Sequence, residues 1–472
     1  MLTSCHSGGS VLDVSGKKVL IIGAARSGIA AAKFLKSRGA VVALTDRKDV
    51  SDWSQEALAL KHIGVGLVPG EIPTWLLDQL DLVVVSPGVP SNLVPIRYAE
   101  RAGVEVIGEI ELAFRYLKGH VIAITGSNGK TTTTTLIGRL LQDAELPVQV
   151  GGNIGTALIS MVESSRDDGW TVVEVSSFQL ETIKQFHPRI AVVLNVTPNH
   201  MDRYETFTDY AAAKHRIFMN QNASDVAVLN ADDRTVSSWE SGLDARVVKF
   251  STKRALEHGL FLRGPELVIR NADERVVVRA DEMKLRGVHN VENVLAALAA
   301  GLAAGANVES MRETVKRFEP VEHRLEFVTE LKGVKFYNDS KATSVDATLK
   351  ALEAFASDEG KVVLIIGGRG KKAPYQPLAQ LVGEKARNLV LIGEDAETIA
   401  KELGAYAPFE RVEDMKDAVT RAFASAKQGD IVLLAPACAS FDMFESFEHR
   451  GKVFKEEVQS LMSNVQRPTS NV

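Results

Sequence analysis

Short runs of branched apolar residues alternate along most of this chain with segments in which apolar residues recur every three or four positions. The first pattern predicts buried strands, and the second predicts helices that cover them. Predicted strands include residues 19–22, 82–85, 121–124, 191–196, 226–230, 361–366 and 431–434. Because helices separate successive strands, the expected fold class is α/β with mostly parallel sheets.

Two breaks divide this pattern into three segments. Lys118-Gly119 marks the first break, and Phe318-Glu319-Pro320 forms the second. We therefore expect three domains, at 1–117, 118–320 and 321–472, of which the first and the last are Rossmann-like. Residues 260–280 alternate in the manner of hairpin strands, and turn residues separate them.

Composition and charge narrow the class of protein. The 472 residues are 45% apolar and 24% charged, as in ordinary globular proteins, and a net charge of -5 argues against broad nucleic-acid binding. No apolar run approaches the roughly 18 residues that span a bilayer. The first ten residues have no basic residue before their weak apolar segment, so no signal peptide is expected. Two cysteines give neither a disulfide framework nor a zinc site, and we expect a reduced cytoplasmic protein.

The strongest chemical pattern is VIAITGSNGKTTTTT at residues 121–135. Glycines there let backbone N–H groups face phosphate oxygens, the lysine reaches terminal phosphates, and a threonine hydroxyl can bind magnesium. The standard motif would place a further glycine at Ile124, so this loop is two residues shorter. The pattern therefore predicts that the central domain is a P-loop-type ATPase domain. The alternative is that these residues form a generic strand-to-helix turn that happens to contain a lysine. The residues expected to bind ATP here are Gly126, Ser127, Asn128, Gly129, Lys130, Thr131 and Thr132.

The first domain carries a pattern close to the dinucleotide-binding fingerprint. Residues 23–28 form a glycine turn after the first strand, and Asp46 follows the second strand as a hydrogen-bond acceptor. Ala25 replaces the middle glycine, which weakens a nicotinamide-dependent dehydrogenase without excluding it. Ser86-Pro87-Gly88 opens another loop at a strand end. A purely structural α/β unit is the remaining alternative.

Three polar residues of the second domain stand in unusual positions. Glu174 lies in an apolar strand, where a carboxylate needs a metal or a partner such as arginine. His200 follows a strand end, where it is either structural or a ligand to metal or phosphate. Lys214 lies on a helix beside small residues, and a surface or salt-bridging role is the common alternative. The asparagine at the start of the helix after 287–293 is an N-cap or a nucleotide contact.

The ordered motifs resemble those of the Mur ligases. In chain order they are TGSNGKTT, GGNIG, EVSSFQL, NVTPNHMDR, Lys214, GVHNVEN, EHR, NDSKAT and APACASFD, and the resemblance extends from about residue 17 to 454. Within the family, SPGVP, SSFQL, NHMDRY and ACASFD are most similar to the member that adds D-glutamate. The resemblance implies an ATP-dependent ligase that joins UDP-N-acetylmuramoyl-L-alanine to D-glutamate through an acyl phosphate, in peptidoglycan precursor synthesis. It also implies two magnesium ions and a monomer.

The resemblance assigns roles to residues in all three domains. Those implied in UDP-substrate binding are Ser27, Asp46, Arg47, Ser86, Gly88, Asn153, Gln179 and His200. Those implied in catalysis are Lys130, Glu174, His200 and Lys214, and those in metal binding are Thr131, Glu174, His200 and Lys214 as a carbamate. ATP would further contact Asn290, Arg324 and Asp339, and D-glutamate would contact Lys341, Thr343, Lys371, Ser440 and Phe447.

Two departures and three alternatives accompany this interpretation. Family members often have an acidic residue near Arg369, so the roles of Arg369 and Lys371 are less secure, whereas Ser127 in place of threonine should matter little. Another Mur ligase that adds a different amino acid is the first alternative, and a folylpolyglutamate synthetase is disfavoured by SPGVP. A nucleotide-dependent binding switch would have no use for Glu174.

Overall fold

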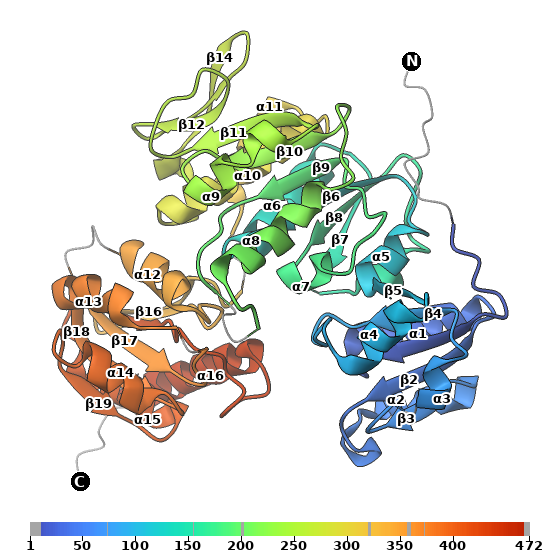
Figure 1. Ribbon diagram of the computed structural model, residues 1–472. Helices are drawn as coiled ribbons and strands as arrows, with labels where there is room; N and C mark the ends of the chain where they lie inside the picture. The colour runs from blue at the N-terminus through green and yellow to red at the C-terminus, as the bar shows by residue number, and fades with distance from the viewer. Residues whose placement is uncertain are drawn as a thin grey trace. The chain divides into compact units, whose positions relative to one another are not determined.

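The computed structural model describes residues 11–72, 74–153, 155–199, 203–319, 322–355, 360–371 and 373–466. Its strands form three mostly parallel sheets. They are distributed over two compact units (Figure 1). Unit 1 comprises Met1–Val196, Thr208–Ala280 and Glu292–Lys316, and unit 2 comprises Thr197–Phe207, Asp281–Val291 and Arg317–Val472. The expected α/β class with parallel sheets is confirmed, whereas the domain limits at 117 and 320 stay a prediction.

The first sheet of unit 1 has five parallel strands in the order β3-β2-β1-β4-β5. The strands are β1 Lys18–Ile22, β2 Val41–Asp46, β3 Gly66–Pro69, β4 Leu82–Val85 and β5 Glu105–Gly108. The helices are α1 Arg26–Ser37, α2 Gln55–Ala59, α3 Thr74–Leu77, α4 Val94–Arg101 and α5 Glu109–Phe114. All four residues of β4 are buried, as expected of a strand covered on both faces. The strand order reverses between β1 and β4, which is where ligands of such sheets bind.

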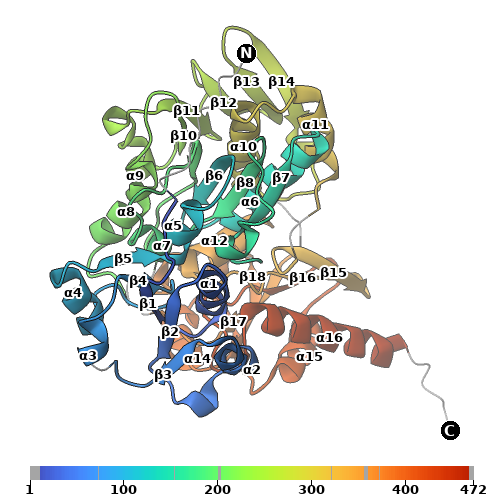
Figure 2. The ribbon, with the colours of Figure 1, turned by 90° about the vertical axis from the view of Figure 1, so that its right-hand side faces the viewer.

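The central sheet of unit 1 has nine strands in the order β14-β13-β12-β11-β10-β9-β6-β8-β7. The strands are β6 His120–Thr125, β7 Val148–Gly152, β8 Trp170–Glu174, β9 Ile190–Val193, β10 Val226–Asn230, β11 Arg246–Ser251, β12 Gly259–Arg263, β13 Glu266–Arg270 and β14 Glu274–Arg279. The predicted hairpins are confirmed, because β12, β13 and β14 pair antiparallel at one edge of the sheet (Figure 2). The strand β6 lies between β8 and β9, at the reversal point of the parallel part.

One predicted helix start around the central sheet needs correction. The helices there are α6 Lys130–Asp143, α7 Ser177–Leu180, α8 Phe207–His215, α9 Arg234–Ser237, α10 Val288–Ala303 and α11 Val308–Arg317. The prediction that residues 287–293 precede the helix is wrong, because α10 begins at Val288. Asn290 is therefore not an N-cap, and its Nδ2 donates to the carbonyl oxygen of Arg286 at 2.7 Å.

The sheet of unit 2 has six strands in the order β15-β16-β20-β17-β18-β19. The strands are β15 Glu326–Leu331, β16 Val334–Asn338, β17 Val362–Gly367, β18 Ala386–Ile392, β19 Phe409–Arg411 and β20 Ile431–Leu434. The helices are α12 Val345–Glu353, α13 Ala379–Lys385, α14 Ala396–Leu403, α15 Met415–Ser425 and α16 Phe447–Gln466. The strand β20, last in sequence, lies between β16 and β17, so loops that are far apart in the chain meet at one edge of the sheet.

The helix α5 joins the two sheets of unit 1. The carboxylate of Glu111, which is fully buried, accepts hydrogen bonds from the backbone N–H groups of Lys184, Gln185 and Phe186 at 2.9 to 3.0 Å. The buried Glu109 accepts one from the N–H of Ile159 at 2.7 Å. Two carboxylates of the short helix α5 therefore accept hydrogen bonds from backbone N–H groups in loops that connect strands of the central sheet.

Candidate active site

A tight glycine loop connects β6 to α6. Gly126 has a φ of 155° and Gly129 a φ of 84°, both in the region that favours glycine. A Cβ added to Gly129 would lie only 2.1 Å from Oδ1 of Asn293, so no larger residue fits there. The N–H of Asn128 donates to Oδ1 of Asn195 at 2.9 Å, and this bond holds the glycine loop against the segment that follows β9.

Two lysine side chains donate to this loop. Lys130 Nζ donates to the carbonyl oxygens of Gly126 at 2.9 Å and Ser127 at 3.0 Å. Lys214 Nζ donates to the same Gly126 oxygen at 2.9 Å. Lys130 therefore places a positive charge at the N-terminus of α6, where the helix dipole also favours an anion.

Lys214 is buried within unit 1, so the alternative of a surface lysine is wrong. Only 2% of the residue is exposed, and its ammonium lies 4.6 Å from the ring centroid of Tyr210. Burial lowers the pKa of Lys214 well below its ordinary value, Lys130 lowers it further, and Glu174 opposes the shift. A lysine in such surroundings is readily neutral, which is the form that reacts with carbon dioxide. The carbamate itself stays a prediction.

Glu174, the last residue of β8, faces the start of α6. Its Oε2 accepts from Oγ1 of Thr131 at 2.8 Å, and its Oε1 accepts from Nδ2 of Asn153 at 3.1 Å. Neither partner is an arginine, so that alternative is wrong for this buried carboxylate. A hydroxyl and a carboxylate are the oxygen ligands that magnesium takes, and the donor set fits this ion. His200, the other expected ligand, lies outside the described residues.

The residues expected to bind the UDP-substrate lie at the carboxyl ends of β1, β2 and β4. Ser86 Oγ donates to the carbonyl oxygen of Gly23 at 3.1 Å, and Oδ2 of Asp46 accepts from the N–H of Ala24 at 2.9 Å. Asp46 is thus an acceptor, as predicted, but for the loop's own backbone. A Cβ added to Gly28 would lie 1.9 Å from the Gly23 oxygen, so helix α1 approaches the turn closely.

The remaining residues expected near the UDP-substrate differ in exposure. Ser27 lies in the first turn of α1, and Arg47 and Gly88 are exposed. Asn153 is exposed and bound to Glu174. Gln179 is buried, and its Oε1 accepts from the N–H of Ser176 at 2.9 Å in a capping box that begins α7. The three-residue spacing from Ser176 to Gln179 is the sequence signal for this cap.

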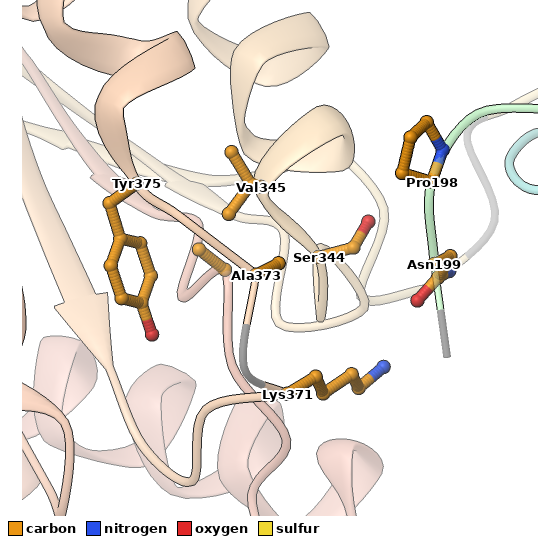
Figure 3. A pocket seen from close by; sticks show the side chains of 8 residues that line it. Pro198, Asn199, Ser344, Val345, Lys371, Ala373 and Tyr375 are labelled. Carbon is orange, nitrogen blue, oxygen red and sulfur yellow. The ribbon is translucent and has the colours of Figure 1, made fainter. Parts of the chain in front are cut away.

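In unit 2, residues expected to bind D-glutamate lie on three loops and at the start of helix α16. Lys371 Nζ lies 3.4 Å from Thr343 Oγ1, and Lys341 Nζ lies 4.9 Å from the ring centroid of Phe447. Ser440 is buried in the loop after β20. A pocket is lined by Pro198, Asn199, Ser344, Val345, Lys371, Ala373, Tyr375 and Ala437, all of unit 2 (Figure 3).

Residues of unit 2 expected to contact ATP include a buried acid. Burial raises the pKa of Asp339 to about 6, although the nearby Arg324 lowers it. Nε of Arg324 is buried and has no hydrogen-bond partner among the described residues. Asn290 is buried as well. A guanidinium with unused donor capacity suits an anionic ligand.

Sequence reasoning missed Arg450, on α16. This arginine is 1% exposed and donates to Oγ of Ser340 at 3.0 Å and to the carbonyl oxygen of Cys438 at 3.2 Å. It therefore ties the loop after β16 to the loop after β20. A signal existed, because Arg450 is on the helical face of Phe454 and Val458, which are fully buried.

Comparisons with known proteins identify the family. Residues 17–108 match the MurD-like N-terminal domain of Mur ligases, residues 124–301 the Mur ligase middle domain, and residues 323–438 the Mur ligase glutamate ligase domain. The UDP-N-acetylmuramoylalanine–D-glutamate ligase of Solibacter usitatus is 49% identical over 451 residues, which cover 95% of this chain and 99% of that protein. The chain belongs to the Mur ligase family. The ligase of the same name from Koribacter versatilis is 47% identical over 95% of this chain and 99% of its own.

Solved structures of Mur ligases share the fold. UDP-N-acetylmuramate–alanine ligase MurC of Thermotoga maritima aligns with a TM-score of 0.59 at 21% identity and covers 94% of this chain and 100% of its own. MurF ligase of the same organism, solved in complex with ADP, has a TM-score of 0.59 at 16% identity over 95% and 96% of the two chains. Among the described helices of this Mur ligase, none combines the length and apolar character that crossing a membrane requires.

Proposed function

We propose that this Mur ligase is an ATP-dependent ligase that joins UDP-N-acetylmuramoyl-L-alanine to D-glutamate in peptidoglycan precursor synthesis. The observation that carries the proposal is 46 to 49% identity, over 95% of the chain, to four proteins named for that activity. The glycine loop with Lys130, Lys214 and Glu174 supports it, because phosphoryl transfer needs this concentration of charge.

The chemistry proceeds in two steps. The substrate carboxylate attacks the γ-phosphorus of ATP, the bond to the β-phosphate oxygen breaks, and an acyl phosphate and ADP form. The neutral amine of D-glutamate then attacks the acyl carbon, a tetrahedral intermediate forms, and inorganic phosphate leaves with its electron pair. The amine proton passes to solvent or a base. Lys130 and the N-terminus of α6 are suited to stabilise negative charge on the phosphoryl group.

Magnesium is part of the proposal. Thr131, Glu174, His200 and Lys214 as a carbamate would hold two ions. When bound, such ions neutralise phosphate charge and orient the γ-phosphate. Lys214 is the residue whose chemistry the buried surroundings favour, because an ammonium there is disfavoured and a carbamate supplies two hard oxygen ligands.

The proposed ligand sites follow the three sheets. The UDP-substrate would lie on the loops of the first sheet, ATP on the glycine loop, and D-glutamate near Lys341, Thr343, Lys371, Ser440 and Phe447. The roles of Asn290, Arg324 and Asp339 toward ATP belong to this proposal. We further propose a cytoplasmic monomer, which agrees with the two cysteines of the chain and with the family resemblance.

The activity is tested by phosphate release from ATP. Release should require magnesium, UDP-N-acetylmuramoyl-L-alanine and D-glutamate together, and omission of any one should reduce it to background. L-glutamate and L-alanine should be used hardly at all. Equal turnover with L-alanine would move this chain to a Mur ligase that adds a different amino acid, and release without an amino acid would contradict the ligase mechanism.

A further inference from the structure

The loop that carries Lys371, residues 368–371 after β17, is held by two neighbouring loops of unit 2. Arg369 exchanges backbone hydrogen bonds with Ala439 at 3.0 and 2.9 Å, and the carbonyl oxygen of Gly368 accepts from the N–H of Asp395 at 3.0 Å. A Cβ added to Gly370 would lie 1.8 Å from Oδ2 of Asp395. The Asp395 carboxylate is therefore packed directly against the backbone next to Lys371.

Tyr375 connects this carboxylate to the loop after β20. The residue is 2% exposed, and its hydroxyl donates to Oδ2 of Asp395 at 2.6 Å. The same hydroxyl lies 3.0 Å from Sγ of Cys438, which is fully buried. A phenol has one proton, and here the proton points to the carboxylate, so the thiol donates to the phenol oxygen. The bonds thus run from Cys438 through Tyr375 to Asp395.

The same tyrosine forms part of the pocket that Lys371 lines. In Figure 3, Tyr375 lies on one side of the pocket and Asn199 on the other, with Ser344 and Lys371 between them. The bonds to Asp395 and Cys438 fix the ring, and Asp395 also fixes the backbone before Lys371. The Tyr375–Asp395 bond therefore connects a wall of the pocket to the carboxylate that packs against Gly370, next to the pocket's lysine.

We infer that Tyr375 and Asp395 are positioning residues for the amino-acid substrate, acting through the loop of Lys371. The inference rests on the proposed function, in which Lys371 binds a carboxylate of the amino acid. Neither residue needs to touch the substrate.

The side chain of Arg369, near which the family resemblance implies an acid, makes its contacts at the surface. The Arg369 guanidinium donates twice to the Glu394 carboxylate, at 3.0 and 2.8 Å, and about half of each side chain is exposed, 52% and 53%. Exposed pairs of this kind contribute little. Arg369 is thus engaged at the surface, and the buried bonds of Tyr375 hold the loop.

Steady-state kinetics of Tyr375→Phe test the inference, with Tyr406→Phe as the matched control. Tyr406 is 43% exposed, and its hydroxyl accepts a hydrogen bond from Nε2 of Gln376 at 3.0 Å. Tyr375→Phe should raise KM for D-glutamate about tenfold, because a bond to a charged group is lost, and should leave kcat and KM for ATP and the UDP-substrate within about twofold. A D-glutamate KM equal to that of Tyr406→Phe would overturn the inference.

Two variants of Asp395 add a test by rescue. Asparagine keeps an oxygen that accepts the tyrosine proton, so Asp395→Asn should stay within about threefold of the wild-type KM, whereas Asp395→Ala should match Tyr375→Phe. Equal KM values for the two Asp395 variants would also overturn the inference. If the wild type uses another amino acid, the proposed function fails, and the same comparison is made with that amino acid.

Discussion

At the scale of single residues, the phosphate loop depends on charge rather than on packing. Lys130 is half-buried and directs its ammonium to two loop carbonyls. Substitution with alanine removes a cation that a nucleotide would meet and leaves the surrounding strands intact. Lys130→Ala should therefore lower kcat by about 10² to 10³ while circular dichroism stays unchanged. Lys33→Ala, at an exposed ion pair with Glu56, is the control, and near-normal activity of Lys130→Ala would contradict the nucleotide role.

A second residue, Glu109, makes the stability of unit 1 depend on pH. Burial raises its pKa from 4.5 to about 7, so the folded protein favours the protonated form. The contribution of Glu109 to the free energy of unfolding is fully present below pH 4.5 and is lost as the pH rises through about 7. The glutamine of Glu109→Gln is neutral at every pH. The free energy of unfolding of this variant should therefore rise, relative to that of wild type, by on the order of 1–3 kcal/mol between pH 5 and pH 8.

Urea unfolding at these two pH values measures the difference for Glu109→Gln. Glu163→Gln, at a side chain that is 75% exposed, is the control for the substitution itself. A constant difference between Glu109→Gln and wild type would show that the carboxylate does not change its protonation in this range.

At the scale of elements, close approach between helix α1 and the turn after β1 requires glycine at position 28. The missing side chain leaves room for the Gly23 oxygen, which would lie 1.9 Å from a Cβ. Gly28→Ala should therefore destabilise the protein by about 1–3 kcal/mol and weaken binding of the UDP-substrate. Gly242→Ala, where a Cβ would meet nothing within 4 Å, is the control. Equal unfolding midpoints of Gly28→Ala and Gly242→Ala in denaturant would show that helix α1 can shift away from the Gly23 oxygen without loss of stability.

The elements also show what the sequence could and could not predict. Most strands with unbroken apolar runs were placed within a residue or two, because burial on both faces leaves a clear pattern, as in β4 and β10. The run predicted at 191–196 is an exception, because its strand β9 ends at Val193. The start of α10 was missed because an asparagine was interpreted as its N-cap, whereas Asn290 and Asn293 both lie inside the helix. The partners of Glu174 and the chain through Tyr375 were not predictable, since they depend on which strands become neighbours. The pairing of β20 with both β16 and β17 joins segments that are far apart in the sequence, so no local residue pattern could predict it.

At the scale of the whole molecule, the expected ligand residues are divided between the two units. Those of the UDP-substrate that the structure describes all belong to unit 1, and those of D-glutamate all belong to unit 2. Asp46→Ala should therefore weaken binding of the UDP-substrate alone about tenfold, as loss of an ordering hydrogen bond to the loop implies, and Lys371→Ala should not change it. Isothermal titration without ATP measures both. A similar loss in Lys371→Ala would show that the units bind this substrate jointly.

The shared carbonyl of Gly126 has a practical consequence for any assay. Lys130 and Lys214 both donate to this oxygen at 2.9 Å, so one acceptor faces two competing donors. Small inorganic anions such as sulfate or phosphate relieve that competition and occupy the loop before a nucleotide arrives. Apparent nucleotide affinity should fall as the sulfate concentration rises, and chloride at equal ionic strength should affect it less. Crystallisation from sulfate would accordingly yield an occupied loop whose lysines have turned away from the peptide oxygen.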